Sequence, residues 1–424
     1  MQHQIRFDQA GPNGTAMASA VEACVHCGFC LPACPTYHLL GEEMDSPRGR
    51  IFLMKEVLEG KLKIDQAMPY IDRCLGCVGC VPACPSGVKY GQLLTSFRGL
   101  AEPQRRRSMA DRFFRRILLA TLPYPGRFRW ALRAGACGRP FRRWLPGRLR
   151  GMLDLLPDRL PADSRLPEVY AAEGARRARV ALLAGCAQQV LAPSINQATL
   201  RVLARNGVEV VIPQRQTCCG ALAAHTGALA AAKKCANQNL AAFPADVDAV
   251  VTNAAGCGSG MQEYGLWLAG EENAAEGQRF AQRVVDVSKF LVDLGTVTHG
   301  SLDQPLQVAY HDACHLAHAQ HVMDPPRQLI RNIENVQLLE IPEGHLCCGS
   351  AGTYNIEQPG AASELGRRKA EAIATTQADL VVTGNIGCLI QVRAHLAKRP
   401  QNIPVMHTME LLDRAYPATP AAGR

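Results

Sequence analysis

The stretch Cys24-Val-His-Cys-Gly-Phe-Cys30-Leu-Pro-Ala-Cys34-Pro35 decides how this chain begins to fold. Its cysteines follow the spacing C-x-x-C-x-x-C-x-x-x-C-P, and the same spacing returns from Cys74 to Pro85. The chain has 424 residues and 18 cysteines, so it is far longer than the small scaffolds that disulfides stabilise. Tight C-x-x-C runs in such a chain favour metal ligation by thiolates in a reducing compartment.

Both runs match the bacterial ferredoxin pattern at every position, which predicts two 4Fe–4S clusters. Three cysteines of each run wrap one cluster, and the fourth, before proline, ligates the other cluster. Two structural zinc sites are the alternative, but zinc ribbons usually pair two C-x-x-C knuckles and lack the terminal Cys-Pro. The crossing rule assigns Cys24, Cys27, Cys30 and Cys84 to the first cluster and Cys34, Cys74, Cys77 and Cys80 to the second.

Composition sets limits on the rest of the chain. Apolar residues make up 47% of it, so each of two or three domains can bury a core. Residues 1–20 lack the apolar h-region of a signal peptide. No run of 18 apolar residues occurs, so no transmembrane helix is expected. We therefore expect a cytoplasmic protein that is soluble or lies on a membrane through a partner or a surface segment.

Much of the net charge of +9 is concentrated in one segment. Between residues 105 and 150 there are fourteen arginines, and Asp111 is the only acid. Apolar and aromatic side chains alternate with the arginines, and Pro123, Pro125 and Pro146 interrupt the stretch. A basic amphipathic stretch favours an anionic lipid surface. Docking to an acidic partner subunit, a solvated linker and nucleic acid are the alternatives.

The C-terminal half contains an internal repeat with its landmarks in the same order. Thr217-Cys-Cys-Gly-Ala221 matches Leu346-Cys-Cys-Gly-Ser350, and the segment 248–257 matches 379–388. In the first copy, short apolar runs separated by helical stretches lie at 180–183, 208–212, 249–252 and 284–287. This pattern predicts α/β domains in which helices cover both faces of a parallel sheet.

Each copy also has four cysteines that follow strand ends, where open α/β sheets bind ligands. They are Cys186, Cys218, Cys219 and Cys257 in the first copy and Cys314, Cys347, Cys348 and Cys388 in the second. Their recurrence predicts that each set converges in space. Three interpretations of each set stay open: a further iron–sulfur centre, a thiol redox site, or packing cysteines left from an ancestral cluster site. Cys137 and Cys235 have no counterparts and are interpreted as structural.

Three histidines, His311, His315 and His345, lie near the second set in sequence. They could carry protons to a quinone or tune a cluster, although a lone histidine is more often satisfied by a local hydrogen bond. The chain has neither a phosphate-binding G-x-x-x-x-G-K-[ST] loop nor a G-x-G-x-x-G after a strand. We therefore expect a partner to perform the two-electron chemistry.

This layout resembles the iron–sulfur subunits of membrane-associated dehydrogenases. The stretches 24–30, 34–41, 47–51 and 345–354 are similar in particular to the iron–sulfur subunits of bacterial glycolate oxidase, over residues 20 to 412. The resemblance implies a complex with two FAD-binding subunits that oxidise glycolate to glyoxylate. This chain would then carry electrons one at a time through two 4Fe–4S clusters toward quinone at the inner membrane, with no catalytic residue of its own.

One departure concerns the Cys-Cys-Gly repeats. Related heterodisulfide reductase subunits end this motif with C-x-x-C, whereas Gly260 and Gln391 stand at the position of the last cysteine here. A non-cubane cluster of that kind is therefore not expected. One alternative function is the same electron-transfer role in a lactate or anaerobic glycerol-3-phosphate dehydrogenase. Another is an iron–sulfur regulator whose basic segment binds nucleic acid.

Together these patterns predict a multidomain chain of a helical ferredoxin-like part and two α/β repeats. The predicted units are an N-terminal extension (1–20), a two-cluster ferredoxin-type domain (21–100), a basic linker (101–177) and two Cys-Cys-Gly α/β repeats (178–300 and 301–415). Residues 105–150 are the expected peripheral membrane contact, and nucleic acid is not expected as a partner.

Overall fold

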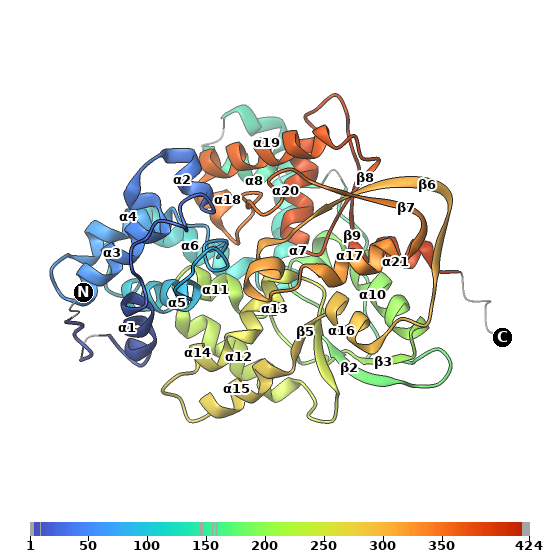
Figure 1. Cartoon of the computed structure of the whole chain (residues 1–424), viewed down its shortest axis with the longest axis horizontal. Helices are drawn as coiled ribbons and strands as arrows, with labels where there is room; N and C mark the ends of the chain where they lie inside the picture. The colour runs from blue at the N-terminus through green and yellow to red at the C-terminus, as the bar shows by residue number, and fades with distance from the viewer. Residues whose placement is uncertain (1–3, 9, 145–146, 155, 158, 418–424) are drawn as a thin grey trace.

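The computed structural model describes residues 4–417 apart from 9, 145–146, 155 and 158. A helical N-terminal module lies at one end of the molecule, and two α/β repeats make up the rest of its length (Figure 1). None of the described helices is long and apolar enough to cross a membrane.

The N-terminal module is built from short helices around the two cysteine loops. Its elements are α1 (Gly14–Glu22), α2 (Pro35–Leu40), η1 (Glu43–Asp45), α3 (Pro47–Leu58), α4 (Ile64–Asp72) and α5 (Tyr90–Ala101). Proline suits the first position of α2 and α3, because that residue's N–H has no partner within a helix. Ser46 caps α3 by accepting a hydrogen bond from the Gly49 N–H at 3.0 Å. The buried side chains of Met54, Ile71 and Phe97 form its core.

The basic segment is folded onto the protein and is not an extended linker. It forms α6 (Met109–Thr121), α7 (Pro125–Cys137), η2 (Arg139–Trp144) and α8 (Gly147–Asp154). Pro123 and Pro125 lie at the junction of α6 and α7, and Pro146 lies outside the described residues. Several arginines turn inward and form the ion pairs Arg105–Asp72 (2.7 Å), Arg107–Glu102 (2.8 Å) and Arg115–Glu357 (3.4 Å). These pairs hold the segment against the N-terminal module and the second repeat.

The first repeat forms a sheet in the order β1-β3-β2-β4-β5. Its strands are β1 (Val169–Tyr170), β2 (Ala178–Leu182), β3 (Val208–Val211), β4 (Ala249–Thr252) and β5 (Val284–Asp286). Its helices are α9 (Gln188–Leu191), α10 (Pro193–Arg205), α11 (Ala221–His225), α12 (Leu229–Ala242), α13 (Ala255–Gln262), α14 (Tyr264–Trp267), α15 (Ala274–Gln282) and α16 (Val287–Leu294). The strands β2 to β5 are parallel and coincide with the predicted apolar runs. The edge strand β1 pairs antiparallel to β3 and was not predicted, because two residues carry no periodicity.

The second repeat forms a parallel sheet in the order β7-β6-β8-β9, the same order as β3-β2-β4-β5. Its strands are β6 (Gly300–His311), β7 (Ile333–Glu340), β8 (Leu380–Thr383) and β9 (Val405–His407). Its helical elements are η3 (His315–Ala319), α17 (Asp324–Arg331), α18 (Tyr354–Glu357), α19 (Pro359–Thr375), α20 (Ile386–Leu396) and α21 (Thr408–Ala415). The predicted α/β class with parallel sheets is therefore confirmed. The domain boundaries stay predictions, although β1 already belongs to the first sheet.

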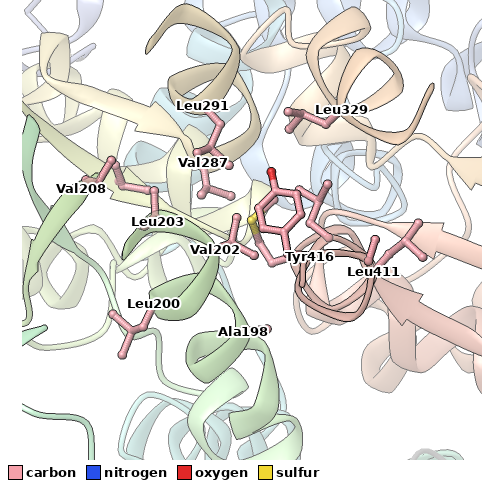
Figure 2. Packing of buried hydrophobic residues seen from close by; sticks show 14 of the residues in the cluster. Ala198, Leu200, Val202, Leu203, Val208, Val287, Leu291, Leu329, Leu411 and Tyr416 are labelled. Atoms are coloured by element: carbon pink, nitrogen blue, oxygen red, sulfur yellow. The ribbon is translucent and has the colours of Figure 1, made fainter. Parts of the chain in front are cut away.

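One hydrophobic core continues across the two repeats. Helices α10 and α16 of the first repeat contact α21 and α17 of the second, respectively. Because α10 corresponds in order to α17 and α16 to α21, the contact has a pseudo-twofold arrangement. Leu203, Val287, Leu329 and Leu411 come from these four helices and are each no more than 3% exposed (Figure 2). The two repeats therefore stabilise each other through burial of the same apolar surface.

Candidate iron–sulfur sites

The first cysteine loop leaves α1 and turns back sharply before α2. His26 and Gly28 have positive φ angles of 55° and 89°, a conformation that glycine adopts without strain. A pocket lies inside this bend and is lined by Cys24, Cys27 and Cys30 from the same loop. Cys84 from the second loop also lines it. This set of four is the one that the crossing rule assigns to the first cluster.

A second pocket lies beside the first and is lined by Cys34, Cys74, Cys77 and Cys80. Three of these cysteines come from the second loop, and Cys34 comes from the first. Cys80, Pro47 and Tyr90 line both pockets, so the two hollows share a wall. Soft thiolates around a mostly apolar hollow suit a 4Fe–4S cluster, and the residues present therefore fit two clusters.

Hydrogen-bond donors and positive charges surround the sulfurs of the second pocket. The Gly76 N–H donates to Cys74 Sγ at 3.4 Å, and Arg50 Nη1 donates to Cys34 Sγ at 3.9 Å. Burial raises the pKa of the Cys77 and Cys80 thiols. Burial acts on Cys74 in the same direction, but the positive charges of Arg50 and Arg98 outweigh it and hold the pKa of Cys74 below its ordinary value. The arginines thus favour the thiolate form that iron ligation requires.

The two pockets differ in their access to solvent. Cys27 is exposed, and the neighbouring Val25 and Phe29 are 66% and 67% exposed. In the second pocket Cys34, Cys74 and Cys80 are buried. Arg98 on α5 donates to the backbone oxygens of Cys74 (2.7 Å) and of His225 in the first repeat (3.0 Å). The first pocket therefore lies at the surface, whereas the second lies against the α/β half.

The cysteines of the first repeat lie at the carboxyl ends of neighbouring strands. Cys186 follows β2 and Cys257 follows β4, at the position where the strand order reverses. The sulfurs form a row in which Cys186 contacts Cys218, Cys218 contacts Cys219 and Cys219 contacts Cys257. The structure thus brings this predicted set together. Of the cysteines interpreted as structural, Cys235 is half-buried on α12 and Cys137 is exposed at the end of α7.

The cysteines of the second repeat converge in the same way and are all buried. The sulfurs of Cys314 and Cys347 lie 4.0 Å apart, and the row continues through Cys348 to Cys388. Cys314 and Cys347 pack in one cluster with Leu75 and Cys77 of the N-terminal module. The second cysteine set therefore adjoins the wall of the second ferredoxin pocket.

The histidines predicted near this set have different surroundings. His311 is 1% exposed, and neither of its ring nitrogens has a hydrogen-bond partner among the residues that the structure describes. The ring of His315 stacks on that of His225 in the first repeat, with centroids 5.2 Å apart. The carbonyl oxygen of His345 lies 3.1 Å from His318 Nε2. Neither His225 nor His318 was singled out from the sequence. No pattern in the sequence marks the contact between His225 of the first repeat and His315 of the second.

Family models match most of the chain. The "4Fe-4S dicluster domain" matches residues 20–88, and the "Cysteine-rich domain" matches residues 180–262 and 308–393. The first match covers all eight cysteines of the two pockets, and each of the other two covers one of the Cys-Cys-Gly sets. Iron–sulfur clusters are therefore the cofactors of the N-terminal module.

Curated relatives extend over nearly the whole chain. The probable glycolate oxidase iron–sulfur subunit of Bacillus subtilis is 38% identical over 92% of this chain and 92% of its own. The glycolate oxidase iron–sulfur subunit of Escherichia coli is 36% identical over 94% of both. Lactate utilization protein A of Geobacillus kaustophilus is 30% identical but matches only 55% of this chain. The chain belongs to the family of glycolate oxidase iron–sulfur subunits.

Proposed function

We propose that this chain is the iron–sulfur electron-transfer subunit of a glycolate-oxidising complex. In this complex, flavin-bearing partner subunits oxidise glycolate to glyoxylate, and this chain conducts the electrons toward quinone. The observation that carries the proposal is the pair of adjoining cysteine pockets, each enclosed by ligands from both loops. A 4Fe–4S cluster accepts and releases one electron at a time, so two of them convert the two-electron output of a flavin into single steps.

The two pockets suggest a direction for the electrons. Cys27, Val25 and Phe29 form an exposed, largely apolar rim around the first pocket. Such a rim suits close contact with a partner subunit, because apolar side chains can be buried there and water excluded. Cys80 separates this pocket from the second one. We therefore assign electron entry to the first pocket and electron exit to the second.

The experiment that tests this function uses the chain purified with its flavin subunits. We expect glycolate to drive reduction of a quinone analogue, and we expect that activity to be lost when this chain is left out. Continued quinone reduction without this chain would remove the proposal.

The lactate relative motivates a second candidate, which is the same electron-transfer role in a lactate-oxidising complex. Preference for lactate over glycolate in the same assay would select it.

We also propose that the complex lies on the cytoplasmic face of the inner membrane through helix α6. Met109, Phe113 and Ile117 follow one another at intervals of four residues, which places them on one face of the helix. Their side chains are 81%, 67% and 45% exposed, and the exposed Arg112 and Arg116 flank them. Apolar side chains between arginines suit insertion into an anionic lipid surface.

Replacing Phe113 by serine is expected to weaken binding to vesicles of anionic lipid by about tenfold, because burial of one such ring in the membrane is lost. Co-sedimentation of the whole complex with anionic and zwitterionic vesicles measures this. Val297→Ser is the matched control, since Val297 is 56% exposed and lies in the α/β half. Equal binding by both variants would contradict the proposal. Loss of a flavin subunit from the Phe113→Ser complex would assign the face to partner docking instead.

A further inference from the structure

His311 is a buried side chain for which the described part of the chain supplies no hydrogen-bond partner. It is the last residue of β6 and is 1% exposed. Neither Nδ1 nor Nε2 makes a hydrogen bond, although a buried imidazole normally does so because an unpaired polar group is costly away from water. The electron-transfer role gives no function to this side chain. Its surroundings therefore point to a ligand.

His311 faces two cysteines of the second repeat. One ring nitrogen of His311 and the sulfurs of Cys348 and Cys388 all lie within 4.8 Å of one another. Within the described part of the chain, this is the only group of three or more His, Cys, Asp or Glu residues that converges so closely. The eight cysteines of the ferredoxin pockets surround wider hollows and do not meet at one point. The contrast indicates a single ion here and not a cluster.

The spacing suits tetrahedral coordination. With Zn–S bonds of about 2.3 Å and Zn–N bonds of about 2.0 Å, the ligand atoms of one zinc ion lie roughly 3.5–3.8 Å apart. Small side-chain rotations would bring His311, Cys348 and Cys388 to that separation. Cys347 Sγ contacts Cys348 Sγ and can provide the fourth ligand. Three thiolates and one imidazole form a common structural zinc site.

The first repeat lacks the histidine and the lysine that distinguish this site. Leu183 stands where the second repeat has His311, three residues before the first cysteine of each set. The glycine of each Cys-Cys-Gly motif packs against an alanine carbonyl. A Cβ atom on Gly220 would meet Ala232 O, and one on Gly349 would meet Ala362 O. Ala232 and Ala362 therefore occupy equivalent positions in the two repeats. Seven residues further on, the first repeat has Asn239 and the second has Lys369.

Lys369 supplies the charge that such a site needs. It is 4% exposed, and its Nζ donates to the backbone oxygens of Glu343 (3.0 Å) and Gly344 (3.2 Å). Burial lowers the pKa of Lys369, and the nearby sulfurs of Cys348, Cys347 and Cys388 oppose that shift. Three thiolates around a divalent cation leave one negative charge, which a lysine ammonium neutralises. A buried charge is tolerated only when it is compensated in this way. The ligand and its compensating cation thus occur together in the second repeat and are both missing from the first.

We propose that the second repeat binds one zinc ion through His311, Cys347, Cys348 and Cys388, and that the first repeat binds none. Zinc has no redox chemistry, so this site conducts no electrons. It ties the end of β6 to the Cys-Cys-Gly loop and the start of α20. Cys347 packs with Leu75 and Cys77, so the ion fixes one wall of the second ferredoxin pocket.

The test is zinc and iron per chain in the full-length protein, purified anaerobically and dialysed against EDTA. We expect about one zinc and about eight irons. His311→Leu introduces the residue that the first repeat already has, and it should lower zinc retention by about tenfold or more while iron stays near eight. His311→Cys should restore zinc. Cys219→Ala, at the equivalent of Cys348 in the first repeat, should leave zinc unchanged.

Three outcomes would overturn the proposal. Equal zinc retention in wild type and His311→Leu would show that His311 is not a ligand. About twelve irons without zinc would place a third cluster in the repeat. If His311→Leu loses iron as well, its fold is disturbed, and Lys369→Asn then decides. That variant should weaken zinc by about tenfold and leave iron unchanged, and unaltered zinc would overturn the proposal. The irons of the two pockets are counted separately, so this result does not depend on the glycolate assay.

Discussion

Replacing Cys34 by alanine is expected to halve the iron content, from about eight to about four per chain, and to abolish quinone reduction by the complex. Cys34 belongs to the first cysteine run in sequence, but it lines the second pocket with Cys74, Cys77 and Cys80. Removing one of four ligands opens that pocket. The first pocket keeps all of its cysteines and therefore its iron. Iron and acid-labile sulfide per chain, on anaerobically purified protein, measure the effect.

Double variants test whether the ligands cross between the runs. If they cross, Cys34→Ala combined with Cys77→Ala removes two ligands of one cluster and still leaves about four irons, whereas Cys34→Ala combined with Cys27→Ala leaves almost none. Without crossing, Cys34→Ala with Cys27→Ala leaves about four irons, and Cys34→Ala with Cys77→Ala leaves almost none. Cys137→Ala is the control, since Cys137 is exposed on α7 and lies in neither pocket. Iron contents that do not differ between the double variants would refute the assignment of the eight cysteines.

Arg50→Met is expected to destabilise the N-terminal module by about 3–5 kcal/mol, because it removes the buried one of the two arginines that pair with the buried Asp45 carboxylate. The side chains of Arg50 and Asp45 are each 1% exposed and form an ion pair at 3.1 Å. Arg50 also donates to Thr36 Oγ1 at 2.9 Å and to the Tyr70 carbonyl at 2.8 Å. The denaturant concentration at which the cluster absorbance is lost measures the effect. The loss of a positive charge near Cys34 should also lower the reduction potential of the second cluster.

Arg73→Met is the matched control for this prediction. Arg73 pairs with the same carboxylate, Asp45, at 2.8 Å, but its side chain is 34% exposed. A partly exposed ion pair contributes up to about 1 kcal/mol, so this variant should shift the denaturation midpoint far less. The double variant Asp45→Asn with Arg50→Met should recover part of the lost stability, because the buried negative charge that has lost its buried partner is then gone. Equal shifts for Arg50→Met and Arg73→Met would show that burial of the pair is unimportant.

The four cysteines that sequence spacing assigns to each cluster line one pocket each, with Cys80 lining both. Such an assignment can be made from sequence because C-x-x-C-x-x-C runs are local and the crossing rule is geometric, and it stays a prediction. The apolar runs that became β2 to β5 were also predicted, since strands buried on both faces stand out as continuous apolar stretches. The twelve-residue β6 extends well beyond its apolar part, because its first half pairs with β7 while remaining partly exposed. Hydrophobicity alone does not mark such a strand.

The surroundings of charged side chains could not be predicted in the same way. In sequence, Arg105, Arg107 and Arg115 look like members of one basic surface, yet they pair with acids from distant segments, including Asp72 and Glu357. The pattern of arginines was therefore a poor guide to the exposed charge. The convergence of Cys348 with Cys388 was predicted from the repeat. The meeting of the His311 ring with these two sulfurs was not, because it depends on how two strands and a loop end at the same edge of a sheet.

The shared core of α10, α16, α17 and α21 has a consequence for the history of the chain. A protein with a single repeat of this kind would have exposed that apolar face to water unless two identical copies paired through it. In a pair of identical copies, any mutation would have altered both cysteine sites at once. Joining the copies in one polypeptide removed that constraint. It allowed the two halves to differ, so that one has a histidine and a lysine where the other has a leucine and an asparagine.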